Sequence, residues 1–386
     1  MQQNQPQPIQ LISTQSDLAA AVRHLADQTI IAGDLEADSM FHFQERICLL
    51  QMAASDIIYI IDPLALTDMA PLRPVMENPA VLKIFHGADY DVRCLFRDYH
   101  ISIQNLFDTE LASRFLGYTE TGLNAVIKQF FNVELEKKFQ KKDWSQRPLP
   151  NEMITYAGDD VRYLIALHDR LEQELIKSAR IEWVLEECDH IAAVRPEPTS
   201  DRPLFTKCKG AGRLEPKTLA VLEALLEMRL EKARQKDRPP FKIMGTTTLI
   251  KLAQARPKSM KALQSTDTLT RKQINMYGKD ILQAVKTGTS VPPGQLPKFP
   301  RHARPKHSAE ATQKIRRLKR WREKEADKLA IDPGVFFSNA QIKTLVEARP
   351  TAIGELETAG GLKKWQIHEY GHKLIDLIQA EEGQRR

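Results

Sequence analysis

The 386-residue sequence has few cysteines and no long apolar run. Its four cysteines form no Cys-x-x-Cys pair and have no histidine at zinc-ligand spacing, so we expect reduced cysteines that pack in the interior. No stretch approaches the roughly 18 uncharged apolar residues of a membrane span. Residues 1–6 also lack the basic start and apolar stretch of a signal peptide, so we expect a soluble, cytoplasmic protein without a membrane partner.

Charge is distributed unevenly along the chain. The net charge is +6, but residues 1–195 carry a net charge of −11 and residues 196–386 a net charge of +17. An acidic half suits bound cations and a basic half suits a polyanion, so this asymmetry indicates contact with nucleic acid. The alternative is that the basic helices only display solvated Lys and Arg side chains.

The first half of the chain has the pattern of an α/β layer fold. Runs of β-forming residues come first and then alternate with helical patterns, and they lie at residues 30–36, 47–52, 57–61, 81–85 and 106–107. This order predicts a mixed sheet with helices packed against it. Apolar residues at helical spacing predict one long amphipathic helix over residues 151–177.

Two polar, proline-rich stretches divide the rest of the chain. Residues 195–203 and 292–305 have the composition of linkers. The segments on either side of the second stretch match each other when shifted by 93 residues, as residues 273–278 match residues 366–371. One shift serves every match without a gap, which predicts duplication of one small helical domain.

Five side chains of the first half form a candidate site. Asp34 and Glu36 are two residues apart on a predicted strand, so both leave the same face of the sheet. Two carboxylates in an otherwise apolar strand repel each other and lose hydration, and bound cations neutralise such a pair. Tyr156 and Asp160 are four apart on the predicted helix and hence adjacent on one face. Asp91 follows the fourth strand, near the edge where ligands of α/β folds bind.

Each of these patterns also fits an ordinary structural role, and two neighbouring acids compete. The strand acids also fit a strand end that emerges into solvent, and the helical pair fits a half-buried helix face. Asp89 is an alternative to Asp91, although Asp91 lies beside the buried face of its helix and Asp89 suits a helix N-terminus. Asp159 is likewise an alternative to Asp160.

Phosphodiester hydrolysis needs side chains of these types. The reaction requires an activated water, a clamp on the scissile phosphate and stabilisation of the departing 3′ oxygen. Two Mg²⁺ or Mn²⁺ ions about 3.5 to 4 Å apart provide all three, and hard divalent cations prefer carboxylate oxygens. The five side chains therefore predict a metal-dependent nuclease.

In order and spacing, the motifs resemble those of the DEDD exonucleases, in the subgroup whose third motif is Tyr-x-x-x-Asp, and within it the ribonuclease D family. The three motifs lie at residues 34–36, 86–91 and 156–160. Residues 107–109 and 142–149 also resemble family segments, and the paired helical repeats resemble HRDC domains. The resemblance covers nearly the whole chain.

The resemblance implies a domain order and a reaction. It implies an α/β ribonuclease H-like exonuclease domain followed by two all-α HRDC domains. The boundaries that we predict are 1–195 for the exonuclease domain, 196–210 for a linker, 211–290 for the first HRDC domain, 291–308 for a second linker and 309–386 for the second HRDC domain. The implied reaction is two-metal hydrolysis from the RNA 3′ end, which releases 5′-mononucleotides. Precursor tRNA, or other structured RNA with a free 3′ end, is the implied substrate.

The resemblance also implies roles for individual residues. Asp34, Glu36, Asp91 and Asp160 would bind the two Mg²⁺ or Mn²⁺ ions. Tyr156 would orient the attacking water, because a phenol with an ordinary pKa near 10 is a poor base at neutral pH. The candidates for substrate contact are Leu35, His86 and Trp144.

Two other functions stay open at this point. A DNA exonuclease would share the motifs, and contacts to the 2′-OH, which no motif reveals, would decide between RNA and DNA. A nucleic-acid-binding scaffold with a lost nuclease site is the third possibility, and the intact acids argue against it. The basic repeats are expected to bind phosphates, and the alternatives are dimerisation or packing on the catalytic domain.

Overall fold

The computed structural model describes residues 7–197, 202–300, 308–359 and 361–380. The expectation about residues 1–6 and part of each proline-rich stretch, 198–201 and 301–307, lie outside the described residues. The chain forms two compact units by its internal contacts. The first unit comprises residues 1–37, 47–196 and 306–386, and the second comprises residues 38–46 and 197–305.

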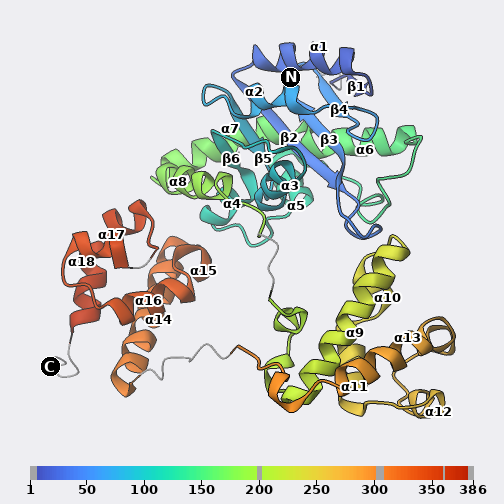
Figure 1. Ribbon diagram of the computed structural model, residues 1–386. Coiled ribbons are helices and arrows are strands. Elements are labelled where there is room, and N and C mark those ends of the chain that lie inside the picture. The colour runs from blue at the N-terminus through green and yellow to red at the C-terminus, as the bar shows by residue number, and fades with distance from the viewer. Residues whose placement is uncertain (1–6, 198–201, 301–307, 360, 381–386) are drawn as a thin grey trace. The chain divides into compact units, whose positions relative to one another are not determined.

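A six-stranded mixed sheet lies in the first unit (Figure 1). Its strands are β1 (Ile9–Ile12), β2 (Ile30–Ala37), β3 (Ile47–Ala53), β4 (Ile58–Ile61), β5 (Leu82–Phe85) and β6 (Leu106–Asp108), in the spatial order β1-β4-β3-β2-β5-β6. β3 is antiparallel to both β2 and β4, and the other pairs are parallel. The predicted α/β fold class is therefore confirmed, with all five predicted strands. β1 was not predicted; it is a short edge strand in which only Ile12 is buried.

Helices cover the sheet and connect its strands (Figure 1). They are α1 (Gln15–Ala26), η1 (Ala70–Leu72), α2 (Arg73–Met76), α3 (Asp89–Tyr99), α4 (Thr109–Phe115), α5 (Leu123–Phe131), α6 (Asn151–Arg162), α7 (Leu164–Lys177) and α8 (Ile181–Ala192). The prediction of one helix over residues 151–177 is wrong, because the chain turns at Tyr163. α6 packs on β1 to β4, whereas α7 packs on β2, β5 and α4. The apolar spacing continues through this turn and so does not reveal it.

The pairing of β2 with β3 fixes the face that carries the two strand acids. Asp34 lies opposite Gln51 and Glu36 lies opposite Leu49, so these four side chains share one face of the sheet. α6 covers the same face: a Cβ added to Gly158 of α6 would lie 2.6 Å from Cδ1 of Ile9 on β1. The register shifts directly after Glu36, as at a β-bulge, and bulges are frequent beside active sites.

Two helical repeats follow the α/β part of the chain. The first contains α9 (Pro216–Gln235), α10 (Pro240–Ile243), α11 (Thr246–Ala255), α12 (Met260–Gln264) and α13 (Arg271–Thr289). The second contains α14 (Ala309–Leu329), α15 (Pro333–Phe336), α16 (Asn339–Ala348), α17 (Ile353–Ala359) and α18 (Lys364–Gln379). Each helix of the second repeat begins 93 residues after its counterpart, which confirms the predicted duplication. The short helices η2 (Leu204–Lys207), η3 (Ala211–Arg213) and η4 (Pro293–Gln295) flank the first repeat.

Within the first unit, the second repeat packs on α8. Trp183 of α8 stacks on Trp365 of α18, with ring centroids 4.5 Å apart and ring planes at 18°. Glu186 of α8 accepts hydrogen bonds from the backbone N–H groups of Lys364 (2.6 Å) and Trp365 (2.9 Å). Packing on the α/β domain, which the sequence left as an alternative for the repeats, is therefore one role of the second repeat.

Within the second unit, the connection between β2 and β3 packs on the first repeat. Nδ1 of His42 lies 2.6 Å from one carboxylate oxygen of Asp237, and the other oxygen accepts a hydrogen bond from the backbone N–H of Phe43. The guanidinium of Arg234 lies over the Phe43 ring. No motif in the sequence indicated this contact.

The structure also bears on the cysteines and on membrane-spanning helices. The four cysteines are all buried, as expected for packing residues. In the part of the chain that the structure describes, no helix is both long enough and apolar enough to cross a membrane.

Candidate active site

The structure brings the five predicted site residues together in the first unit. Asp34 and Glu36 extend from β2, Asp91 lies in the first turn of α3, and Tyr156 and Asp160 lie on α6. The carboxyl of Glu36 interacts electrostatically with those of Asp34, Asp160 and Asp91. Asp34 in turn interacts with Asp91 and Asp160, and Tyr156 interacts with Asp160, Glu36 and Asp34. Three elements far apart in the sequence thus supply one acidic neighbourhood.

Burial raises the pKa values of all four acids. It raises the pKa of Asp34 to about 7 and that of Asp160 to about 8, where repulsion from Asp34 contributes as well. Burial, followed by repulsion from the other three carboxylates, raises the pKa of Glu36 to about 10. Burial and the charge of Asp34 hold the pKa of Asp91 well above its ordinary value. These carboxyls are therefore partly or fully protonated at neutral pH unless another cation replaces the protons.

The donor set fits divalent metal ions. Carboxylate oxygens are the ligands that Mg²⁺ and Mn²⁺ prefer, and bound cations would relieve the repulsion that raises these pKa values. Among the described residues, no three His, Cys, Asp or Glu side chains are arranged so that they could hold a metal ion in this structure. The four acids are therefore electrostatic neighbours whose carboxylates do not converge on one point in this structure.

The two alternative acids, Asp89 and Asp159, each form an ion pair with an arginine. Asp89 is exposed and pairs with Arg93, whereas Asp91 is 6% exposed. Asp159 pairs with Arg162 at 2.8 Å. Each competing acid thus already has a cationic partner on its own helix.

Tyr156 is held between two aromatic rings. Its ring contacts Phe139 edge-on, with centroids 5.6 Å apart, and Trp144 at 6.0 Å. Burial and the nearby carboxylates raise its pKa above the ordinary value, so the phenol stays protonated at neutral pH. Trp144 is 1% exposed, so in this structure it packs against the Tyr156 ring and does not line a surface that a substrate reaches.

The other two predicted substrate residues lie in different surroundings. Leu35, between Asp34 and Glu36, is 6% exposed. His86 directly follows β5, and its Nδ1 lies 2.9 Å from the Thr109 hydroxyl. That hydroxyl donates to the Phe85 carbonyl at 3.0 Å, so its oxygen can accept a hydrogen bond from Nδ1 of His86 in the tautomer that is protonated there. Burial lowers the pKa of His86, which favours the neutral ring.

Asp108 frames Asp91, and sequence reasoning missed this role. Asp108 is 2% exposed, and its carboxylate accepts hydrogen bonds from the backbone N–H groups of Gly87, Ala88 and Glu110, each at 2.9 Å. These bonds fix the turn that begins α3 and thereby the position of Asp91. The sequence signal was present in residues 107–109, but it carried no information about which N–H groups the carboxylate meets.

Arg147 holds the segment that carries Trp144, and it was also missed. Its guanidinium donates to both carboxylate oxygens of Asp62, at 2.6 and 2.7 Å. It also donates to the carbonyls of Trp144 and Cys48, each at 2.8 Å. A bidentate pair of this kind fixes geometry as well as charge. The partner lies far away in sequence, which is why no local pattern indicated the bond.

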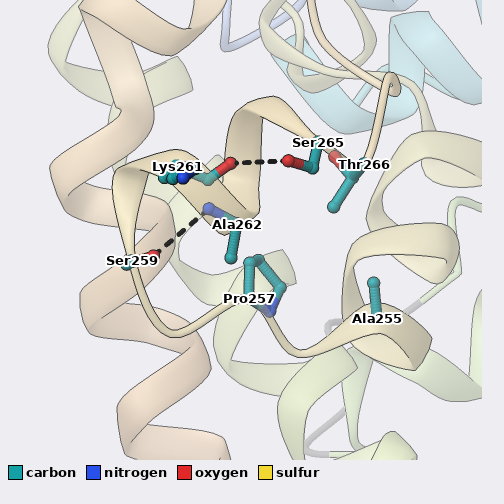
Figure 2. A pocket seen from close by; sticks show the side chains of 7 residues that line it. All are labelled: Ala255, Pro257, Ser259, Lys261, Ala262, Ser265 and Thr266. Atoms are coloured by element: carbon teal, nitrogen blue, oxygen red, sulfur yellow. Dashed lines mark hydrogen bonds between the residues drawn. The ribbon is translucent and has the colours of Figure 1, made fainter.

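A cavity of about 600 Å³ lies in the second unit, between the end of α11 and the α12 region (Figure 2). Its lining includes two hydroxyl residues that serve the local helix: Oγ of Ser259 accepts from the Ala262 N–H, and the Ser265 hydroxyl donates to the Lys261 carbonyl. Among the residues that the structure describes, no acid, histidine or cysteine lines this cavity. It lacks the groups that hydrolysis requires, so it is not the candidate active site.

Known proteins match both parts of this architecture. The 3′-5′ exonuclease family model matches residues 9–176, and the HRDC domain model matches residues 218–285 and 312–378. The protein named ribonuclease D from Pseudomonas paraeruginosa is 26% identical over 374 residues, which cover 96% of this chain and 98% of that relative.

Solved structures agree with these matches. The catalytic core of RRP6 from Trypanosoma brucei is 30% identical, with 73% of this chain and 80% of that chain covered and a TM-score of 0.63. Escherichia coli RNase D, which is 24% identical, shares the fold over 96% of this chain and 98% of its own, with a TM-score of 0.74. On these matches, the chain belongs to the ribonuclease D family of 3′-5′ exoribonucleases, hydrolases with an exonuclease domain followed by HRDC domains.

Proposed function

We propose that this chain trims structured RNA from its 3′ end and releases 5′-mononucleotides, with precursor tRNA among its substrates. The observation that carries this proposal is the acidic neighbourhood formed by Asp34, Glu36, Asp91 and Asp160, in which all four pKa values are raised. Perturbed carboxyls that gather in this way are frequent at catalytic sites. The relatives named ribonuclease D support the reaction class.

The four acids would hold two Mg²⁺ or Mn²⁺ ions. Such ions, when bound, supply the activated water, the clamp on the phosphate and the stabilisation of the leaving 3′ oxygen. The carboxylates bind and orient them, and partial burial strengthens each charge interaction. The framing of Asp91 by Asp108 and the placement of Asp34 on a paired strand keep two of these ligands on fixed backbone.

Tyr156 would orient the attacking water, and it would do so as a neutral phenol. Its raised pKa argues against service as a base, and the rings of Phe139 and Trp144 hold it in place. We assign the metal-binding roles to Asp91 and Asp160, because Asp89 and Asp159 form ion pairs on their own helices.

The substrate contacts are proposed from position. Leu35, between two metal-binding acids, would press against the terminal nucleotide, and the neutral His86 ring would lie beside it. The basic repeats would hold the RNA backbone through Lys and Arg, with affinity that falls as salt rises. The domain boundaries given above and a cytoplasmic location stay predictions.

End-labelled substrates test this function. A 3′-extended tRNA and a DNA strand of matched sequence, each labelled at the 5′ or the 3′ end, are incubated with the full chain, with and without Mg²⁺ or Mn²⁺. We expect metal-dependent, stepwise shortening of the RNA from its 3′ end. Faster cleavage of the DNA would favour the DNA exonuclease alternative, and shortening from the 5′ end would refute the proposal.

Neighbouring acids on the same helices provide matched controls for the site. Asp91→Asn and Asp160→Asn should bind RNA but not cut it. Asp89→Asn and Asp159→Asn, which make the same chemical change one or two residues away, should cut at nearly the wild-type rate. Full activity in Asp34→Asn would remove the assignment.

A further inference from the structure

Gln51 is a buried polar side chain without hydrogen bonds. It lies in the middle of β3 and is 0% exposed. Neither Oε1 nor Nε2 has a hydrogen-bond partner among the described residues. Leaving an amide buried and unpaired is costly, and most buried polar groups in folded proteins are paired. Such a group calls for a partner that is engaged in another state of the protein.

The register of the sheet identifies the residues opposite Gln51 on the two paired strands. The residues directly opposite it are Asp34 on β2 and Ile60 on β4. Side chains that face each other across antiparallel strands share one face, with Cβ atoms about 4.5 to 5.5 Å apart. A glutamine amide at that separation reaches a carboxylate. Of the two opposed residues, only Asp34 has a polar side chain.

A second buried glutamine, Gln366, has hydrogen-bond partners for both ends of its amide. Gln366 is 1% exposed, and its Nε2 donates to the Phe336 carbonyl at 2.6 Å. Its Oε1 accepts from the Lys363 N–H and from Nε2 of Gln341, each at 2.9 Å. Both ends of Gln366 are therefore satisfied, whereas both ends of Gln51 are open.

We propose that Gln51 is a positioning residue for Asp34: its amide Nε2–H donates to the Asp34 carboxylate when that carboxylate binds a divalent cation. This inference rests on the proposed function. Carboxylates that hold a metal usually accept a hydrogen bond from a neighbouring group, which fixes their rotamer. A hydrogen bond to a charged carboxylate is also stronger than one between neutral groups. In this assignment the Gln51 amide forms its hydrogen bond only in the metal-bound state.

The experiment measures metal binding without RNA turnover. Mn²⁺ is titrated calorimetrically into the full-length wild type, Gln51→Met and the control Gln366→Met, and Tm is measured for each protein without metal. We expect Gln51→Met to bind Mn²⁺ roughly 10- to 100-fold more weakly, as is typical when such a supporting group is lost. Its metal-free Tm should equal or exceed that of the wild type, because an unpaired amide has been removed.

The control should show the opposite pattern. Gln366→Met should bind Mn²⁺ as the wild type does and have a lower metal-free Tm, because it loses paired hydrogen bonds. Gln51→Asn, which keeps the amide but shortens its reach, is the second variant and should also bind Mn²⁺ more weakly. Wild-type Mn²⁺ affinity in both Gln51 variants would overturn the inference.

The role of Gln51 and the proposed function can be refuted separately. If Asp34→Asn loses Mn²⁺ binding and the Gln51 variants keep it, the role of Gln51 is refuted and the proposed function stands. If the wild type neither binds Mn²⁺ nor shortens RNA, the proposed function itself is refuted.

Discussion

The packing of α18 on α8 depends on the carboxylate of Glu186. The side chain of Glu186 is 20% exposed and satisfies the backbone N–H groups of Lys364 and Trp365, at 2.6 and 2.9 Å. These are two of the N–H groups that a helix leaves without an internal partner at its start. Loss of a capping side chain costs about 1 kcal/mol, and a negative charge at a helix N-terminus contributes about 0.3 to 1 kcal/mol. Glu186→Ala should therefore destabilise this packing by about 1 to 2 kcal/mol.

Urea unfolding followed by tryptophan fluorescence measures this loss. The chain has four tryptophans, and the stacked pair Trp183 and Trp365 lies at this contact. With a slope of about 2 kcal/mol per molar urea, the first transition should move down by about 0.5 to 1 M. Only midpoints are compared, because a chain of several domains does not unfold in two states.

Two further variants separate capping from a general effect of charge. Glu186→Gln keeps one oxygen acceptor and loses the charge, so its midpoint should lie between those of the wild type and Glu186→Ala. Asp189→Ala removes an exposed acid from the same helix and should leave the midpoint unchanged. If Glu186→Ala unfolds at the wild-type midpoint, the reasoning about this cap is refuted.

Three other outcomes follow from the site and the packing. Tyr156→Phe should lower kcat by about 100-fold without changing Mn²⁺ affinity, as single-turnover rates and calorimetry would show, because one polar group at the reacting water is lost. Burial raises the pKa of Asp34 to about 7 and that of Glu36 to about 10. The contribution of these two protonated carboxyls to the free energy of unfolding is fully present below about pH 4 and is lost as pH rises through those values. The metal-free Tm should therefore fall from pH 6 to pH 9, and saturating Mn²⁺ should reduce that fall; equal slopes with and without metal would contradict this. Gly117→Ala should destabilise the chain by about 2 to 4 kcal/mol in urea, because Gly117 has φ +88 and an added Cβ would lie 1.9 Å from a backbone oxygen. Gly122→Ala, where nothing lies within 4 Å, is its control.

The sequence predicts the parts of the site that depend on local spacing. The two-residue period of a strand places Asp34 and Glu36 on one face, and the register of β2 bears this out. The same local reasoning separates Asp91, which is buried, from Asp89, which is exposed. In each case the information lies within one turn of helix or a few residues of strand.

The supporting residues depend on contacts that no local spacing encodes. Asp62 and Arg147 are joined only when the segment before α6 folds over the sheet. Asp108 is an ordinary acid in the sequence until its oxygens meet the N–H groups at the start of α3. The turn at Tyr163 was hidden for a related reason. α6 packs on β3 and β4 and α7 packs on β5 and α4, yet the two helices together have the apolar spacing of one.

The same supporting contacts affect how the second repeat should be studied. α8 carries Glu186, which caps α18, and also Cys188, whose sulfur accepts the backbone N–H of Asp108 at 3.2 Å. Deleting residues 309–386 would therefore remove packing from a helix that contacts the frame of Asp91. Loss of activity in such a truncation would therefore not distinguish lost RNA binding from a disturbed site. Charge reversal at exposed positions such as Arg320 and Lys343 leaves the packing intact. A change in the salt dependence of RNA affinity in these variants would therefore measure RNA contact alone.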